Sequence, residues 1–94
     1  MNQEKYLEAV QTAERLRSLL ASGGWKIIDT YLKRVRASNL ERLVTAKDMK
    51  EVLFCQAAIQ TIDALYSEIE SLIRNGETAR QALNTQGGGE NING

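Results

Sequence analysis

Apolar residues recur at alternating intervals of three and four positions between Asp48 and Ile73, and the predicted fold is organised around this stretch. The series consists of Val52, Cys55, Ile59, Ile62, Tyr66, Ile69 and Ile73. An unbroken spacing of this kind is the pattern of a coiled-coil seam. Because Leu65 and Leu72 widen the stripe, we expect this helix to bury it against another element.

An earlier helix is predicted over residues 3–22. Its apolar face consists of Tyr6, Val10, Ala13, Leu16 or Arg17, and Leu20. Ser22, Gly23 and Gly24 follow, and because paired glycines favour a left-handed C-terminal cap, we expect them to end this helix and to permit a hinge. The helix could fold back on the rest of its chain or pack against a neighbouring subunit, and the wide stripe of 48–73 favours the neighbour.

The segment 25–44 predicts a second helix. Its stripe consists of Trp25, Ile28, Leu32 and Val35, with Ile27 and Tyr31 on the flank. The spacing loses register after Val35, which either a stutter in one continuous helix or a short break capped by Ser38 to Glu41 would explain. The lack of Gly and Pro in this segment favours a continuous helix.

The connection between the second and third helices predicts their relative direction. Thr45-Ala46-Lys47-Asp48 has the form of a capping box at the start of the third helix, so only a few residues join the two helices and they should be antiparallel neighbours. Residues 25–44 contain five basic and two acidic side chains, whereas 48–73 contain five acidic and one basic. These opposite charges favour the alignment, although each exposed ion pair contributes only about 0–1 kcal/mol.

The predicted architecture is therefore all-α, with a long antiparallel, coiled-coil-like helical hairpin and an additional N-terminal helix after the Gly-Gly hinge. A single helical domain should span 1–84, with helices near 3–22, 25–44 and 48–75, a cap at Asn75-Gly76 and a weak extension to 83. Residues 85–94, rich in Gly and Asn, should form a flexible tail. The residues expected to pack in the hairpin or against a partner are Trp25, Ile28, Leu32, Val52, Ile59, Ile62, Leu65, Tyr66, Ile69 and Leu72.

Composition narrows the available chemistry. The 94 residues include no histidine and one cysteine. His-based acid–base catalysis and His-containing metal sites are therefore excluded, and Cys55, on the apolar stripe, is expected to be a buried, inert thiol. The run Gly87-Gly88-Gly89 lacks the Lys-Ser/Thr sequence of a phosphate loop. We expect no enzymatic activity, catalytic residue, cofactor, metal or small-molecule substrate.

A basic cluster on the second helix offers a different function. Lys33, Arg34 and Arg36 are candidate contacts to a polyanion, so a nucleic-acid-associated regulator that uses the basic face of 25–44 is the alternative function. Twelve basic and twelve acidic residues give zero net charge, which argues against nucleic-acid binding. No apolar run approaches the roughly 18–20 residues of a membrane span, and the first residues do not resemble a signal peptide, so we expect an intracellular protein without a membrane segment.

A longer pattern covers about half the chain, from Trp25 to Leu72. It consists of Trp25-x-x-Ile28-x-x-Tyr31-Leu32, Leu40-x-x-Leu43, Ala46-Lys47-Asp48 and Phe54-Cys55-Gln56-Ala57-Ala58-Ile59 leading into Leu65. This arrangement resembles small helical-hairpin proteins encoded by tailed bacteriophages, although the position of Ala57 more often holds glycine in that pattern. The resemblance implies a non-enzymatic virion or assembly component, cytoplasmic or incorporated in a virion, that acts through protein partners, self-association or both.

Overall fold

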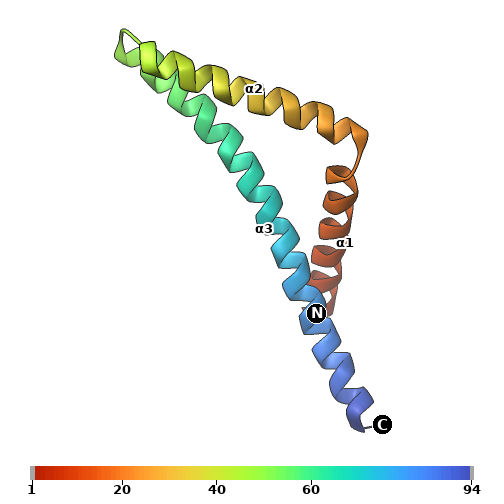
Figure 1. The fold of residues 1–94 in the computed structure, drawn as a ribbon. Helices are drawn as coiled ribbons and strands as arrows, with labels where there is room; N and C mark the ends of the chain where they lie inside the picture. The colour runs from red at the N-terminus through yellow and green to blue at the C-terminus, as the bar shows by residue number, and fades with distance from the viewer. Residues whose placement is uncertain (1, 94) are drawn as a thin grey trace. The chain divides into compact units, whose positions relative to one another are not determined.

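The computed structural model describes the backbone of residues 2–93 and the side chains of residues 3–85. Three helices follow one another: α1 (Asn2–Leu20), α2 (Gly23–Thr45) and α3 (Met49–Asn93), as Figure 1 shows. No strand occurs within residues 2–93. The prediction of an all-α protein is confirmed.

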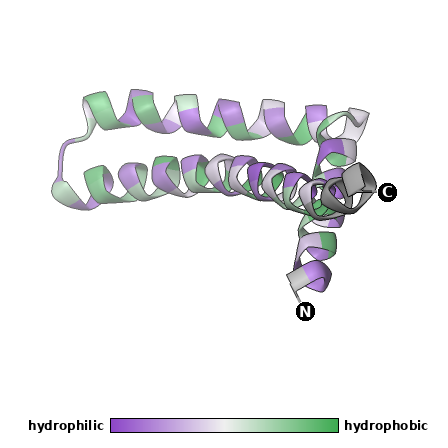
Figure 2. Cartoon of the chain, turned by 90° about the horizontal axis from the view of Figure 1, so that it is seen from below, coloured by the Kyte–Doolittle hydropathy of each residue, from purple (hydrophilic) through white to green (hydrophobic). Residues whose placement is uncertain are grey.

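Two compact parts make up the chain, and each is described by itself. The α1 part consists of α1 together with α3 from Ile69 onward. The α2 part, residues Ala21–Glu68, contains α2 and the beginning of α3. Along α2 and α3, hydrophobic and hydrophilic residues alternate at short intervals, as expected for helices with one covered face (Figure 2).

The start of α2 differs from the prediction. Ser22 is its N-cap, with extended backbone angles and a hydroxyl that accepts a hydrogen bond of 3.1 Å from the Trp25 amide. Gly23 and Gly24 therefore lie in the first turn of α2, and no glycine among the described residues has a positive φ. The expected left-handed glycine cap at the end of the first helix is wrong, because a serine side chain satisfies the free amides of the following helix instead.

The middle of α2 is one continuous helix, as favoured from the sequence, with no break at Ser38 or Asn39. Its covered positions follow a regular spacing of four and three residues. They include Trp25, Asp29, Leu32, Arg36, Asn39 and Leu43. Three residues of this series, Asp29, Arg36 and Asn39, are polar. They occupy seam positions, so a pattern that follows only apolar residues loses its register along this helix.

The start of α3 also differs in detail. The Glu51 amide donates a hydrogen bond of 2.8 Å to the Asp48 carboxylate, three residues back, as in an N-cap. Thr45 instead ends α2, and its hydroxyl lies 3.5 Å and 3.4 Å from the carbonyl oxygens of Glu41 and Arg42. The capping residue of α3 is therefore Asp48 and not Thr45.

No cap forms at Asn75-Gly76, because α3 continues through both residues to Asn93. Gly76 is buried, and a Cβ added there would overlap the Cβ of Ala13 and lie 2.8 Å from the Ala9 carbonyl oxygen. The glycine thus lets α1 and α3 approach closely and does not end a helix. Residues 85–93 of the expected tail fall within the bounds of α3, whereas the side chains from 86 onward and Gly94 lie outside the described residues.

Two ion pairs flank this close approach in the α1 part. Arg17 pairs with Glu77 at 2.6 Å and Arg80 with Glu14 at 2.5 Å. Ala13 is 1% exposed, and it is covered within its own chain. The favoured prediction that α1 packs against a neighbouring subunit is therefore wrong for this face, because α3 from Ile69 onward, including the stretch beyond residue 75 that was expected to be a weak extension, supplies the packing surface.

The core of the α2 part follows the predicted seam of α3. Cys55 is fully buried and Ile62 is 7% exposed, while Val52, Ile59 and Tyr66 are half-buried. On α2, the side chain of Asn39 is also buried in the α2 part. Its core therefore combines aliphatic side chains with a polar one.

Candidate interaction surface

An aromatic and charged cluster joins α2 to α3 in the α2 part. The rings of Trp25 and Tyr66 meet edge to face, with centroids 6.1 Å apart and planes at 68°. The Tyr66 hydroxyl donates a hydrogen bond to the Asp29 carboxylate, which also pairs with Lys33 at 3.0 Å. The hydrogen bond to Tyr66, followed by the contact with Lys33, lowers the pKa of Asp29. The same hydrogen bond, followed by burial, raises the pKa of Tyr66 to about 12.

A bidentate ion pair lies further along the two helices. Arg36 donates through Nε to Asp63 Oδ1 at 2.8 Å and through Nη2 to Oδ2 at 3.1 Å. The hydrogen bonds from Arg36 lower the pKa of the Asp63 carboxyl. Such a fork fixes both distance and orientation between the helices more than a single contact does.

The basic residue Arg42 bridges two groups of α3. Its Nε lies 3.9 Å from a Glu51 carboxylate oxygen, and its guanidinium carbon lies 5.4 Å from the centre of the Phe54 ring. A cation over an aromatic face is attracted by the ring quadrupole. The pairs Arg42–Glu51 and Arg36–Asp63 each join a basic residue of α2 to an acidic residue of α3, in accord with the opposite charges predicted for the two helices.

Asn39 is the buried polar residue of this part. Its Nδ2 donates a hydrogen bond of 2.8 Å to the Val35 carbonyl oxygen of the same helix, and its Oδ1 is buried with no hydrogen-bond partner among the described groups. A buried acceptor without a partner loses its hydration without compensation, which costs about 1–3 kcal/mol. Residues of this kind at seam positions favour one helix register over others.

The predicted packing residues divide between the two parts. Ile28 and Leu65 are exposed, at 48% and 43%. Ile69, which is buried, and Leu72, which is half-buried, belong to the α1 part. The remaining predicted packing residues are buried or half-buried in the α2 part: Trp25, Leu32, Val52, Ile59, Ile62 and Tyr66.

The three candidate polyanion contacts have different surroundings. Lys33 pairs with Asp29, and Arg36 pairs with Asp63, so their charges are balanced within the chain. Arg34 lines a surface hollow on α2. Of the three, only Arg34 has no carboxylate placed beside it among the described residues.

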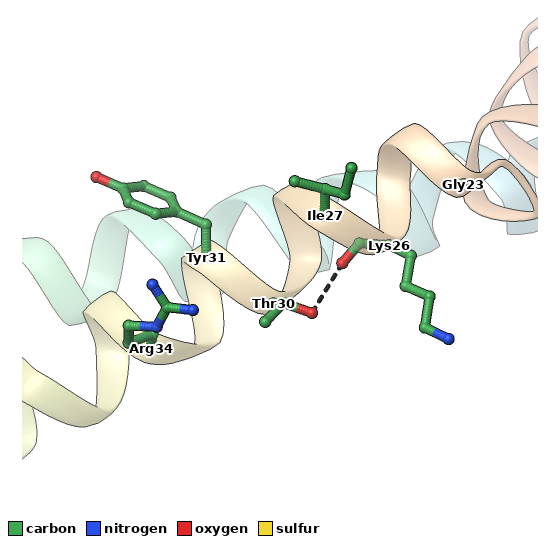
Figure 3. Close-up of a pocket in the computed structure, with 6 residues that line it drawn as sticks. All are labelled: Gly23, Lys26, Ile27, Thr30, Tyr31 and Arg34. Atoms are coloured by element: carbon green, nitrogen blue, oxygen red, sulfur yellow. Dashed lines mark hydrogen bonds between the residues drawn. The ribbon is translucent and has the colours of Figure 1, made fainter.

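Two adjoining hollows form an exposed, largely apolar surface of the α2 part. The first, which we call the interhelical groove, is lined by Tyr31, Leu32, Val35, Phe54, Ala57, Ala58, Thr61 and Ile62. The second, the α2 hollow, is lined by Gly23, Lys26, Ile27, Thr30, Tyr31 and Arg34. Tyr31 belongs to both, and Figure 3 shows that Ile27 and Tyr31 project from the same side of α2. The groove and the hollow therefore form one surface.

The sequence pattern placed Ile27 and Tyr31 on the flank of the second helix, whereas Phe54 entered only through the resemblance to bacteriophage proteins. Ile27, Tyr31 and Phe54 are 74%, 59% and 61% exposed. All three lie outside the heptad seams of their helices, since the seam residues are the covered ones. Large apolar side chains that do not fit the seam spacing were the signal that could have located a second contact surface.

Comparisons with protein-family models, curated proteins and solved structures find no match for this chain. Across the described residues, no helix has both the length and the apolar character needed to cross a bilayer. The same residues contain no group of three or more Cys, Asp and Glu side chains placed to hold a metal ion. The exposed apolar surface is thus the feature on which a functional argument can be built.

Proposed function

We propose that this chain is a small structural or assembly protein that acts through helical protein–protein contacts, as a component of a bacteriophage particle or of its assembly. The observation that carries the proposal is the apolar surface of the α2 part, where Ile27, Tyr31 and Phe54 stand exposed beside a core that is already packed. Exposed apolar residues that gather in one place mark interaction sites more often than isolated ones do. The phage setting is supported by the pattern from Trp25 to Leu72, which resembles small helical-hairpin proteins encoded by tailed bacteriophages.

We further propose that α2 and the beginning of α3 form the antiparallel, coiled-coil-like hairpin expected from the sequence. The support is the order of the paired residues. Asp29 meets Tyr66, Arg36 meets Asp63 and Arg42 meets Glu51, so positions rise along α2 while they fall along α3. A hairpin braced in this way presents a rigid surface, and rigid surfaces lose less conformational freedom on binding.

A non-enzymatic role is part of the proposal. The groups with shifted pKa values are Asp29, Arg36, Asp63 and Tyr66, and each bonds to another of them across the two helices. Structural pairs shift pKa values just as active sites do, and here the pairing itself accounts for the shifts. Since Lys33 and Arg36 balance carboxylates of the chain, nucleic-acid binding ranks behind protein contact.

The test is recovery of the full chain with its native assembly. Particles purified from the native source at low and high salt should contain the chain in fixed proportion to other structural proteins, because packed apolar contacts resist salt. A parallel experiment measures binding of the full chain to duplex DNA at both salt concentrations, since phosphate contacts weaken steeply with salt. Recovery of the chain only in the free fraction, together with salt-sensitive DNA binding, would replace this proposal with the regulatory alternative.

A further inference from the structure

We propose that the surface formed by the interhelical groove and the α2 hollow binds an amphipathic helix of a different protein, with acidic residues beside its apolar face. This inference rests on the proposed function and specifies the chemistry of the partner. Its centre is Tyr31, which lines both hollows. Phe54, on α3, also lines the interhelical groove.

The shape of the groove suits a helix. Small side chains, Ala57, Ala58 and Thr61, line the groove together with the aromatic Tyr31 and Phe54. Small residues allow the side-chain ridge of an approaching helix to settle between larger neighbours. The Thr61 hydroxyl donates a hydrogen bond of 2.8 Å to the Ala57 carbonyl oxygen, so its proton is already engaged within α3 and the groove presents mainly apolar groups.

The α2 hollow has the same character. The Thr30 hydroxyl donates to the Lys26 carbonyl oxygen at 2.8 Å, as Figure 3 shows, so it too is satisfied within its own helix. An extended or polyproline segment would bring unpaired backbone groups to this surface, and the threonine hydroxyls that line it are already engaged. A helix satisfies its own backbone and presents only side chains, so the surface favours a helical partner.

Charge selects the kind of helix. The residues that line the two hollows include the cations Lys26 and Arg34 and no carboxylate. A partner with Asp or Glu beside its apolar face would complement this local positive charge, although the net charge of the whole chain is zero.

The same charges argue against a second copy of this chain as the occupant. A twofold contact places one surface patch against its own copy. When that contact is centred near Tyr31, Lys26 of one protomer approaches Arg34 of its partner, and like charges brought together oppose association. The partner is accordingly a different, acidic helix.

A displayed library of random helical peptides provides the probe. The full chain is the target, and Ala57→Glu serves for counter-selection, because it places a bulky negative charge between the groove walls at an exposed position. Val44→Ser is the matched control, since Val44 is 86% exposed on α2 and lines neither hollow. Helix content and solution mass of each variant are measured first.

Enriched peptides should carry apolar residues at intervals of three and four with Asp or Glu beside them. Their affinity should fall at least about tenfold for Ala57→Glu and stay unchanged for Val44→Ser. Absence of enrichment, proline-rich or basic sequences, equal binding to Ala57→Glu, or displacement of the peptides by duplex DNA would each overturn the inference. A lower solution mass in folded Ala57→Glu would show that a second copy occupies the surface. Any of these results leaves the recovery of the chain with its native assembly to be judged independently.

Discussion

Replacing Gly76 by alanine tests the close approach of α1 and α3. In an ordinary helix interior, this change stabilises a protein by about 0.5–1 kcal/mol, because glycine loses more backbone freedom on folding. At Gly76 the new Cβ would overlap the Cβ of Ala13 and lie 2.8 Å from the Ala9 carbonyl oxygen. Neither atom can move aside by a side-chain rotation, so the helices themselves must separate.

The expected loss follows from that separation. Carbon atoms pack best at roughly 3.5–4.0 Å, so α1 must move away from α3 by about 1–2 Å. Overpacking of this kind costs about 1–3 kcal/mol. The shift also opens contacts around Ala13, which is 1% exposed. After allowance for the helix-propensity gain, we expect Gly76→Ala to lower the free energy of unfolding by about 1–2 kcal/mol.

Gly24→Ala is the matched control. Gly24 is also helical, but nothing lies within 4 Å of a Cβ built there, so its replacement should be neutral or stabilise by up to about 1 kcal/mol. Urea unfolding followed by circular dichroism gives the free energies. Amide hydrogen exchange should show the loss of protection in α1 for Gly76→Ala while residues 25–68 keep theirs.

A second substitution sharpens the result. Ala13→Gly removes one of the two obstructing groups, so it should recover part of the stability lost in Gly76→Ala and give a favourable coupling energy in a double-mutant cycle. Equal stabilities of Gly76→Ala and Gly24→Ala, or additive effects at Gly76 and Ala13, would refute the close-approach argument.

Two further predictions concern polar groups of the α2 part. Asn39→Leu should raise the free energy of unfolding by about 1–2 kcal/mol, because it removes the unpaired buried Oδ1; a loss of stability on urea unfolding would show that this oxygen has a partner. One tyrosine, Tyr66, should ionise near pH 12, and Tyr66→Phe should abolish that late rise in phenolate absorbance; loss of absorbance near pH 10 instead would contradict the hydrogen bond. Because its folded pKa is raised from 10.0, Tyr66 stabilises the fold fully below pH 10.0 and ceases to do so as the pH rises through about 12. The lowered pKa of Asp29 has the opposite sign, so its contribution is present above 3.8 and disappears as the pH falls through the folded value; stability should therefore fall at both extremes.

The sequence predicted the seam of α3 better than the seam of α2, for a physical reason. In α3 the seam is formed by apolar residues such as Cys55 and Ile62, so hydrophobic spacing alone reveals it. In α2 the seam includes Asp29, Arg36 and Asn39. Each is acceptable there because of a specific partner on α3 or in its own helix, and no single-helix pattern contains that information.

The glycines were misinterpreted because local rules and tertiary packing compete. Asn75-Gly76 fits the sequence signature of a helix end, yet the contact with α1 uses the missing Cβ of Gly76. Gly23 and Gly24 fit the same signature, and there the cap of Ser22 assigns them to the next helix. Ile27 and Tyr31 were placed on the flank of the second helix, but the extent of their exposure could not be predicted, since it depends on which side of α2 the neighbouring helix leaves uncovered.

Cys55 can report transient separation of α2 from α3 through its thiol. It is the only cysteine of the chain and its side chain is fully buried in the α2 part. A thiol reagent can reach it only during moments when α2 and α3 separate, so the labelling rate measures how often that happens. Because the cysteine lies in one part only, the rate reads out that part without interference from the other, and no label or substitution has to be introduced.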